Sequence, residues 1–261
     1  MKVSLKNKPQ VKAAICFICL LVVWEILARI NCIPTYILPP FSQVIATLWQ
    51  ELVHGNLLLM TGRTLLVLGE ALGISLLTSL ILVFLCQKSK TFRSFYKMVA
   101  AIMNSIPSLA LLPIIIMWIG IDNAAIIALV MHSVIWTFTI YVMNGINSIS
   151  KSYREFSNNI DLTSFNKLIH VYIPAALPSI VSGLKIAWGR AWRSLIGAEI
   201  LFGAIGSAGG LGYFININRQ IGDMSKVLAG VIIIVTVGLL VEFCVFRKID
   251  HKLKVWGMNN E

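Results

Sequence analysis

Six long apolar runs dominate the pattern of hydrophobic and polar positions along this chain. They cover residues 13–30, 64–86, 98–119, 124–146, 178–202 and 226–246. A helix needs about 20 mostly apolar residues to cross a bilayer, whereas a barrel strand has about 10 and alternates apolar with polar positions. The run lengths therefore predict an all-α, polytopic membrane protein with about six transmembrane helices.

The composition agrees with this pattern. Hydrophobic residues make up 57% of the 261 residues and charged residues 13%, and the mean hydropathy is +0.83. So few polar residues could not cover the surface of a water-soluble globule. We expect one membrane domain, with no room for a sizeable soluble domain.

The basic side chains are divided unevenly between the two sides of the predicted bundle. The chain has 22 Lys and Arg against 11 Asp and Glu. Those on the richer side are Lys2, Lys6, Lys8, Lys12, Lys88, Lys90, Arg93, Lys97, Lys151, Arg154, Lys167, Arg247, Lys248, Lys252 and Lys254. The other side keeps only Arg29, Arg63, Arg219 and Lys226. Because cytoplasmic loops carry an excess of Lys and Arg, both termini are predicted to be cytoplasmic. No basic patch is interleaved with aromatic residues, so nucleic acid is not an expected partner.

The first apolar run begins like a secretory signal but continues to Ile30 without a small-x-small cleavage site. It is predicted to remain as the first span. Cys16 and Cys19 form a C-x-x-C inside this run, without a second pair or a histidine cluster nearby. We interpret them as small apolar packing residues rather than zinc or redox ligands. No metal site and no disulfide framework are predicted.

A short amphipathic helix is expected on the outer side, between the first two spans. Ser42 is a suitable N-cap for a helix over residues 43–54, in which Val44, Leu48 and Leu52 recur at helical spacing. The pattern predicts an interfacial helix with Trp49 near the headgroups. Ordinary packing of a connecting helix and a functional role both remain open.

The third run contains two prolines six residues apart, Pro107 and Pro113, just after Ser105. Proline removes a backbone donor and disturbs the carbonyl one turn earlier, so it kinks a helix. Inside a bilayer, the freed polar groups must face protein or a cavity. We therefore predict a single bent helix that faces the bundle.

The fifth run carries four ionisable side chains: Lys185, Arg190, Arg193 and Glu199. A charge at mid-bilayer costs roughly 2.5–3.5 kcal/mol on insertion scales. One interpretation is pairing with Glu25, Glu70 or Glu242 of other spans. The other is a polar face, shared by Arg190 and Arg193, along the route of an anionic or polar solute. The two interpretations are compatible.

Other polar features favour no enzymatic chemistry. We interpret His132, alone in the fourth run, as a helix–helix hydrogen bond rather than a proton relay. The glycine-rich stretch 203–213 lacks the Gly-Lys-Ser/Thr of a phosphate-binding loop, and is predicted to be a flexible or re-entrant connection. No nucleophile–base set is present, so the chain is predicted to be non-catalytic.

Three segments together resemble the permease subunits of bacterial ABC importers, in the branch that handles nitrate, sulfonate, taurine and pyrimidine-type solutes. They are Ser105-Ile-Pro107-Ser-Leu-Ala-Leu-Leu-Pro113 with the run up to Gly120, the segment from His170 through Pro174, Pro178, Gly183 and Arg190 to Leu201, and Gly210-Leu-Gly212-Tyr213. The likeness covers most of the chain and implies an ABC transmembrane type-1 domain at 57–246. An N-terminal span with the external helix would precede it at 1–56, and a cytoplasmic tail would follow at 247–261.

The resemblance also implies a coupling helix that docks into the ATPase subunit. Counting back from Pro174, Glu155 matches the glutamate of the family's Glu-Ala-Ala motif and Phe165 its aromatic position. Phe156 and Ser157 replace the alanines, and Asp161 replaces the motif glycine. Asp161 can cap the second helix of the loop, as glycine also permits.

As a member of this family, the chain would be a multi-pass protein of the bacterial inner or plasma membrane and would form a homodimer. Cytoplasmic ATPase subunits would bind ATP and Mg²⁺, so the permease itself would hold no cofactor, and an extracytoplasmic binding protein would deliver the solute. Ser105, Pro107, Arg190, Arg193 and Glu199 are the candidate path residues. The alternative is an ion-coupled secondary transporter, which predicts inverted repeats with paired broken helices; no internal repeat is evident. A membrane enzyme or assembly scaffold is a third class: the enzyme would need a catalytic cluster, which is not apparent, and the scaffold would not require Arg190, Arg193 and Glu199 in one span.

Overall fold

The computed structural model describes residues 9–30, 33–149, 166, 171–203 and 209–255. Every regular element in these ranges is helical, which confirms the all-α prediction. The elements are α1 (Pro9–Arg29), α2 (Phe41–Val53), α3 (Leu57–Lys88), α4 (Lys90–Ser105), α5 (Ser108–Ile119), α6 (Asn123–Asn147), α9 (Ile173–Phe202), α10 (Leu211–Gln220), α11 (Met224–Val241), the π-helical turn η3 (Glu242–Phe246) and α12 (Arg247–Val255).

Within the described ranges, four helical segments are long and apolar enough to cross a membrane. They are α1, α3, α6 and the continuous run from α11 to Leu253. A fifth crossing results if α4 and α5 together form one bent span. Helix α9, the predicted fifth span, is 30 residues long but is not among them, because its four ionisable side chains lower its hydropathy.

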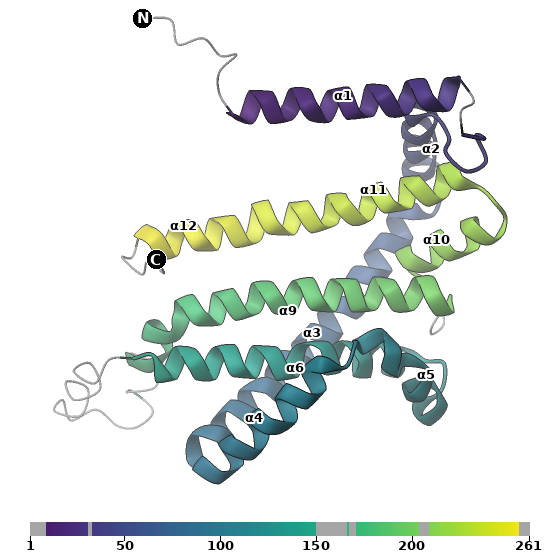
Figure 1. Ribbon diagram of the computed structural model, residues 1–261. Coiled ribbons are helices and arrows are strands. Elements are labelled where there is room, and N and C mark those ends of the chain that lie inside the picture. The colour runs from purple at the N-terminus through teal and green to yellow at the C-terminus, as the bar shows by residue number, and fades with distance from the viewer. Residues whose placement is uncertain (1–8, 31–32, 150–165, 167–170, 204–208, 256–261) are drawn as a thin grey trace, which may run out of the picture.

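Helices α6 and α9 lie side by side at the centre of the molecule and share its most extensive contact (Figure 1). Helix α3 packs across α6, and α11 packs on α10 and α2. Helix α1 stands apart and is held through α2. The buried core accordingly lies where α3, α6 and α9 meet, at residues such as Leu68, Leu129, Val130, Ala187 and Leu195.

The contact between α6 and α9 is close because glycines occupy it. A Cβ atom at Gly145 would lie 2.6 Å from the Cβ of Ser179, and one at Gly183 would lie 2.7 Å from the Cβ of Tyr141. Small residues let transmembrane helices approach to van der Waals contact when water supplies no hydrophobic driving force between them. The two glycines therefore fix the position of α9 against α6.

The third apolar run is broken more sharply than the sequence predicted. Instead of one bent helix, α4 ends at Ser105 and α5 begins at Ser108, with a bend of 98° between them. Pro107 stands at the break as the N-cap of α5, whereas Pro113 lies inside α5. Proline at the start of a helix loses no intrahelical hydrogen bond, so the chain turns at Pro107.

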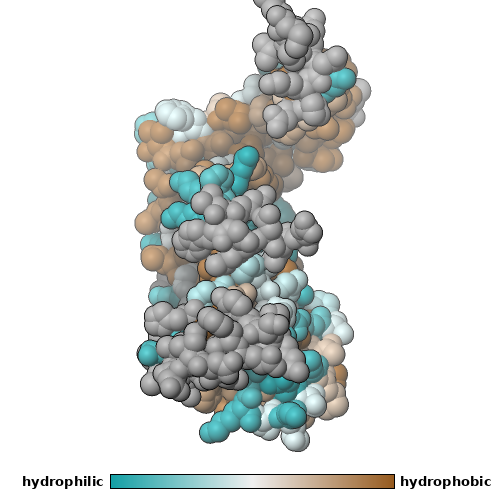
Figure 2. All heavy atoms as spheres, turned by 90° about the vertical axis from the view of Figure 1, so that its left-hand side faces the viewer, coloured by the Kyte–Doolittle hydropathy of each residue, from teal (hydrophilic) through white to brown (hydrophobic). Residues whose placement is uncertain are grey.

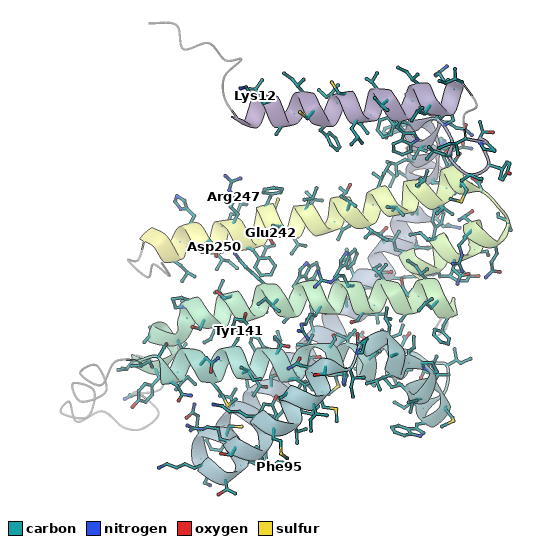
Figure 3. The ribbon with its side chains drawn as sticks, in the orientation of Figure 1. Lys12, Phe95, Tyr141, Glu242, Arg247 and Asp250 are labelled. Atoms are coloured by element: carbon teal, nitrogen blue, oxygen red, sulfur yellow. The ribbon has the colours of Figure 1, made fainter. Side chains whose placement is uncertain are left out.

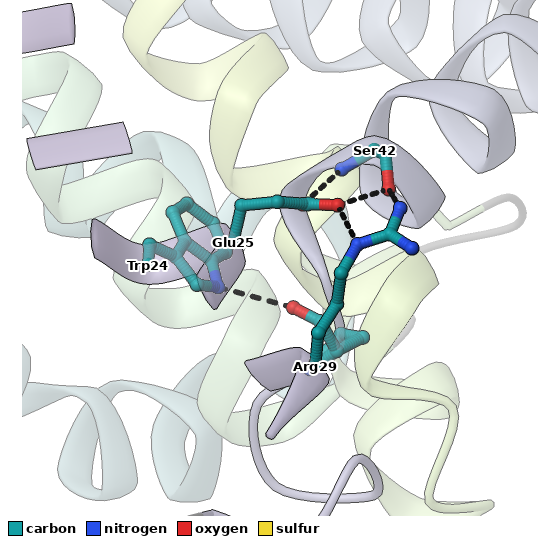
Figure 4. Close-up of polar contacts among 5 residues, drawn as sticks. Trp24, Glu25, Arg29 and Ser42 are labelled. Carbon is teal, nitrogen blue, oxygen red and sulfur yellow. Dashed lines mark hydrogen bonds and ion pairs between the residues drawn. The ribbon is translucent and has the colours of Figure 1, made fainter. Parts of the chain in front are cut away.

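A compact polar joint fixes α1 to α2 (Figure 4). The Trp24 indole donates to the Pro39 carbonyl at 3.0 Å. The Glu25 carboxylate accepts from the Ser42 amide at 3.0 Å and its hydroxyl at 2.8 Å, and pairs with Arg29 at 2.6 Å. The prediction that Ser42 caps the outer helix is wrong, because Pro40 is the N-cap of α2 and makes no side-chain cap. The Ser42 hydroxyl is instead engaged by Glu25.

Helix ends predicted to be cytoplasmic gather at one end of the molecule. Helices α1 and α9 start, and α6 and α12 end, at the left in Figure 1. Figure 2 views this end, where hydrophilic side chains lie among the described residues and hydrophobic surface flanks them. At this end, the helix of the sixth predicted span continues past residue 246 to Val255.

We expect Gly183→Val to separate α6 from α9, because its new side chain would collide with Tyr141. Overpacking of this kind costs about 1–3 kcal/mol. Thermal unfolding in detergent should show a lower midpoint than for Gly238→Val, a control whose added Cβ meets nothing within 4 Å. Equal midpoints for the two variants would contradict the close contact.

Candidate functional site

A polar cavity of 270 Å³ opens where α4, α5, α6 and α9 meet. The break between α4 and α5 forms one wall, and the polar face of α9 forms the other. Its lining residues are Met103, Asn104, Ile106, Pro107, Ser108, Leu109, His132, Ser133, Arg190, Arg193 and Ser194. Two guanidinium groups thus face a small space inside an otherwise apolar bundle, and no carboxylate is among the described lining residues.

Asn104 ties the three helices around this cavity together. Its Oδ1 atom accepts a hydrogen bond from Arg190 Nη1 at 3.1 Å and another from the Thr137 hydroxyl at 2.9 Å. The partner of Arg190 is therefore a neutral amide, which orients the guanidinium group without neutralising its charge. The remaining Arg190 donors stay available for an anion.

Arg193, one helical turn after Arg190, is the less constrained of the two cations. Its side chain is exposed, and within the described part of the chain it has no ion pair or hydrogen bond. Next to it, the Ser108 and Ser194 hydroxyl oxygens lie 2.8 Å apart, joining α5 to α9. The cavity wall thus combines a cation without a described partner with a pair of hydroxyl groups that join two helices.

His132 does not make the helix–helix hydrogen bond that the sequence suggested. Both ring nitrogens are buried and have no hydrogen-bond partner in the described structure. The ring faces the cavity and meets Trp136 edge-on, with 6.4 Å between the ring centroids. Because its neighbours there are the cavity and an aromatic ring, no acceptor or donor of another helix reaches it. A buried imidazole without a hydrogen-bond partner is costly, so His132 is a polar group that the bundle leaves unsatisfied.

Of the five predicted path residues, three line the cavity and two lie elsewhere. Pro107, Arg190 and Arg193 line it. Ser105 is exposed and donates its hydroxyl hydrogen to the Ala101 carbonyl at 3.0 Å. Glu199 is buried beyond the cavity, near the end of α9.

Glu199 anchors the start of α10. Its carboxylate accepts from the Thr64 hydroxyl at 3.1 Å and from the Gly212 amide at 2.8 Å. The Leu211 amide donates to the Thr64 hydroxyl oxygen at 2.7 Å. A carboxylate at a helix N-terminus satisfies amides that have no intrahelical partner and interacts favourably with the helix dipole. Glu199 thus joins α3, α9 and α10, the last a short helix that the sequence analysis did not anticipate.

The ion pairs expected for the fifth run are formed differently. Lys185 pairs with Asp250 of α12, which Figure 3 shows on the α12 ribbon next to α9. Glu25 is taken by Arg29, and among the described contacts neither Glu70 nor Glu242 pairs with a cation of α9. The alternative partners proposed from the sequence were therefore wrong, because Arg29 and Ser42 engage Glu25, and Glu70 and Glu242 are exposed.

The predicted coupling residues Glu155, Asp161 and Phe165 lie outside the described residues. Pro174 is described and is the second residue of α9. Proline is well tolerated there, because the first-turn amides of a helix have no intrahelical acceptor. The helix that enters the core thus begins immediately after the predicted coupling segment.

Asn104, Ser108, Ser133 and Ser194 are cavity residues that the sequence analysis missed. One signal was available, since Asn104 and Ser108 are four residues apart, as are Arg190 and Ser194. Such spacing places each pair on a shared helix face. The break at Pro107, which moves Ser108 into a second helix facing Ser194, could not be read from the spacing.

We expect Glu199→Ala to release the start of α10 and lower the thermal unfolding midpoint. The substitution leaves buried donors at Thr64 and Gly212 unpaired, and each such donor costs about 1–3 kcal/mol. Glu70→Ala is the matched control, because Glu70 is an exposed span residue without a described partner. If Glu70→Ala is as destabilising as Glu199→Ala, the anchoring role of Glu199 is wrong.

Comparison with known proteins gives a consistent result. The sequence model described as "Binding-protein-dependent transport system inner membrane component" matches residues 71–254. The chain is 28% identical to the putative aliphatic sulfonates transport permease protein SsuC of Bacillus subtilis, over 93% of this chain and 86% of that protein. It is 27% identical to the taurine transport system permease protein TauC of Escherichia coli, over 91% and 86%. With the nitrate import permease protein NrtB of Leptolyngbya laminosa it shares 31% identity over 53% and 48%.

Proposed function

The chain belongs to the family of binding-protein-dependent transport system inner membrane components and is the permease subunit of an ABC importer, and we propose that its polar cavity is a station on the path of a small oxyanion. This family membership supports the ABC permease over the ion-coupled secondary transporter. The names of its relatives describe transport of aliphatic sulfonates, taurine and nitrate. All three solutes carry an anionic oxygen group.

This proposal rests on the pair of cations in the cavity. Arg190 and Arg193 face a space of 270 Å³ without a carboxylate among the described lining residues. Isolated charges in a span are costly, and hydrogen bonds between arginine and an oxyanion are strong and can be bidentate. The hydroxyls of Ser108, Ser133 and Ser194 add donors of the kind that oxyanions accept. An anionic solute therefore offsets a charge that the bundle itself leaves uncompensated.

The transport cycle requires a second copy of the chain and two ATPase subunits. A homodimer would enclose the path between the two polar faces of α9, while a binding protein delivers the solute from outside. ATP and Mg²⁺ would be held by the ATPases alone. ATP binding must stabilise one of two permease states over the other, and the coupling segment containing Glu155, Asp161 and Phe165 would transmit this bias into α9 through Pro174.

The same scheme sets the orientation in the inner or plasma membrane. The basic end of the molecule, with Lys88, Lys90 and the end of α12, would face the cytoplasm and the ATPases. The end with α2, α5 and α10 would then face the binding protein. Both termini are cytoplasmic in this arrangement.

We expect Arg193→Gln and Arg190→Gln to reduce uptake of an anionic solute, each by tenfold or more, because a charge-assisted hydrogen bond contributes roughly 1.5–3 kcal/mol. Cells that express the importer would be given labelled taurine, an alkanesulfonate, nitrate or a neutral pyrimidine. Arg219→Gln is the control, since Arg219 is an exposed cation outside the cavity. Preferred uptake of the neutral pyrimidine, with no effect of either cavity substitution, would overturn the oxyanion assignment.

Charge reversal in the coupling segment should separate the permease from its ATPase. We expect Glu155→Lys or Asp161→Lys to reduce co-purification of the ATPase subunit from detergent while membrane insertion stays normal. Lys252→Glu, a charge reversal on the exposed surface of α12 at the same end, serves as the control. Full recovery of the ATPase with both coupling variants would show that this segment does not dock it.

A further inference from the structure

A second, apolar cavity of 490 Å³ lies at the basic end of the bundle. It opens between the end of α3, the end of α6 and the start of α9, and its lining includes Leu80, Phe84, Gln87, Val142, Tyr172 and Ala176. Its volume is within the roughly 300–1,000 Å³ typical of ligand pockets. The cavity shares no lining residue with the polar cavity around Arg190, so the proposed solute path does not account for it.

Gln87 is a polar residue in this apolar lining, and its amide nitrogen has no described hydrogen-bond partner. Its Oε1 atom accepts from Arg93 Nη2 at 2.7 Å, and Arg93 Nε donates to the Cys86 carbonyl at 2.9 Å. The amide is therefore held with its oxygen toward Arg93. Its Nε2 atom is buried and has no hydrogen-bond partner in the described structure. A buried amide donor without an acceptor is costly, so a rotation of the Gln87 side chain toward an acceptor oxygen on an apolar occupant would remove that cost.

The chain that follows Gln87 is strongly basic. Lys88, Lys90 and Lys97 are exposed, and Arg93 is fixed against Gln87. No Asp or Glu occurs in the sequence between Glu70 and Asp122, so this basic cluster has no acidic neighbour on α4 or on the adjoining half of α3. Positive charge beside an apolar cavity at a membrane surface is the combination that attracts anionic lipids.

We propose that this cavity binds an anionic phospholipid of the cytoplasmic leaflet. One acyl chain fills the space between α3, α6 and α9, an ester carbonyl oxygen accepts from Gln87 Nε2, and the phosphate lies among Lys88, Lys90 and Arg93. The lipid would pack between α3 and the start of α9, next to the segment that is proposed to bind the ATPase. This assignment depends on the membrane orientation of the permease and not on which solute it carries.

The test compares lipid binding by matched variants of the full-length chain. After extraction in mild detergent, native mass spectrometry would count retained phospholipids, and titration with phosphatidylglycerol or phosphatidylcholine would measure apparent affinity and thermal stabilisation. Leu80→Trp fills the cavity from its exposed rim, whereas Leu77→Trp places the same ring one turn away, at a position 64% exposed and outside the lining. Lys88→Gln with Lys90→Gln removes charge from the chain that follows Gln87. Lys248→Gln with Lys252→Gln removes equal charge from α12.

We expect the wild-type chain and the Leu77→Trp variant to retain phosphatidylglycerol in preference to phosphatidylcholine, and Leu80→Trp to lose it. Removal of Lys88 and Lys90 charge should weaken phosphatidylglycerol binding about thirtyfold, given the usual contribution of a lysine near an anionic membrane surface. If the two double-lysine variants weaken phosphatidylglycerol binding equally, the binding reflects general charge attraction, and the proposed site is wrong. Equal stabilisation by both lipids, or unchanged binding by Leu80→Trp, would overturn it as well.

Discussion

Helices α6 and α9 pack so closely at Gly145 and Gly183 that an added methyl group would not fit between them, and α3, α4, α5 and α10 pack against this pair. Helix α3 crosses the pair, and α4 and α5 both contact α6. In lipid, such packing cannot rest on water exclusion between helices, so shape complementarity and polar contacts must hold the bundle together. The polar cavity forms where the paired helices meet the break between α4 and α5.

The four ionisable groups of α9 illustrate how the bundle accommodates charge. Lys185 is paired with Asp250, Arg190 is oriented by the neutral Asn104, and Glu199 binds the first amides of α10. Each of these contacts joins α9 to a different helix and so has a structural role. Arg193 has no described partner and faces the cavity. Among the four, it is therefore the side chain most readily explained by a ligand.

Much of the fold could be predicted because the period and length of apolar runs depend only on local sequence. The helical character of all six runs follows from such local patterns. The 98° bend after Ser105 could not be predicted, because proline tolerates both a kink and a full break, and tertiary packing decides between them. The pairing of Lys185 with Asp250, 65 residues away, was missed for the same reason: the sequence does not say which helix faces which.

The two proposed binding sites differ in the polarity of their linings. The solute cavity is polar and lies between packed helices with two cations, which suits a small ion that must enter and leave. The second cavity has no charged residue in its lining, and the exposed Lys88 and Lys90 follow its lining residue Gln87 in the chain, which suits a ligand that stays in the bilayer. A permease needs both properties, because its path must be wet while its outer surface remains matched to lipid.

The most direct test of the central claim is the charge selectivity of the polar cavity, measured on Ser108→Cys in a background with the native cysteines replaced. The reaction rate of this thiol with a small sulfonate-bearing reagent would be compared with that of an ammonium-bearing reagent of similar size. Because Arg190 and Arg193 line the same space, the account predicts faster modification by the anionic reagent and loss of that preference in Arg193→Gln. Equal rates, or faster modification by the cationic reagent, would contradict an oxyanion path through this cavity.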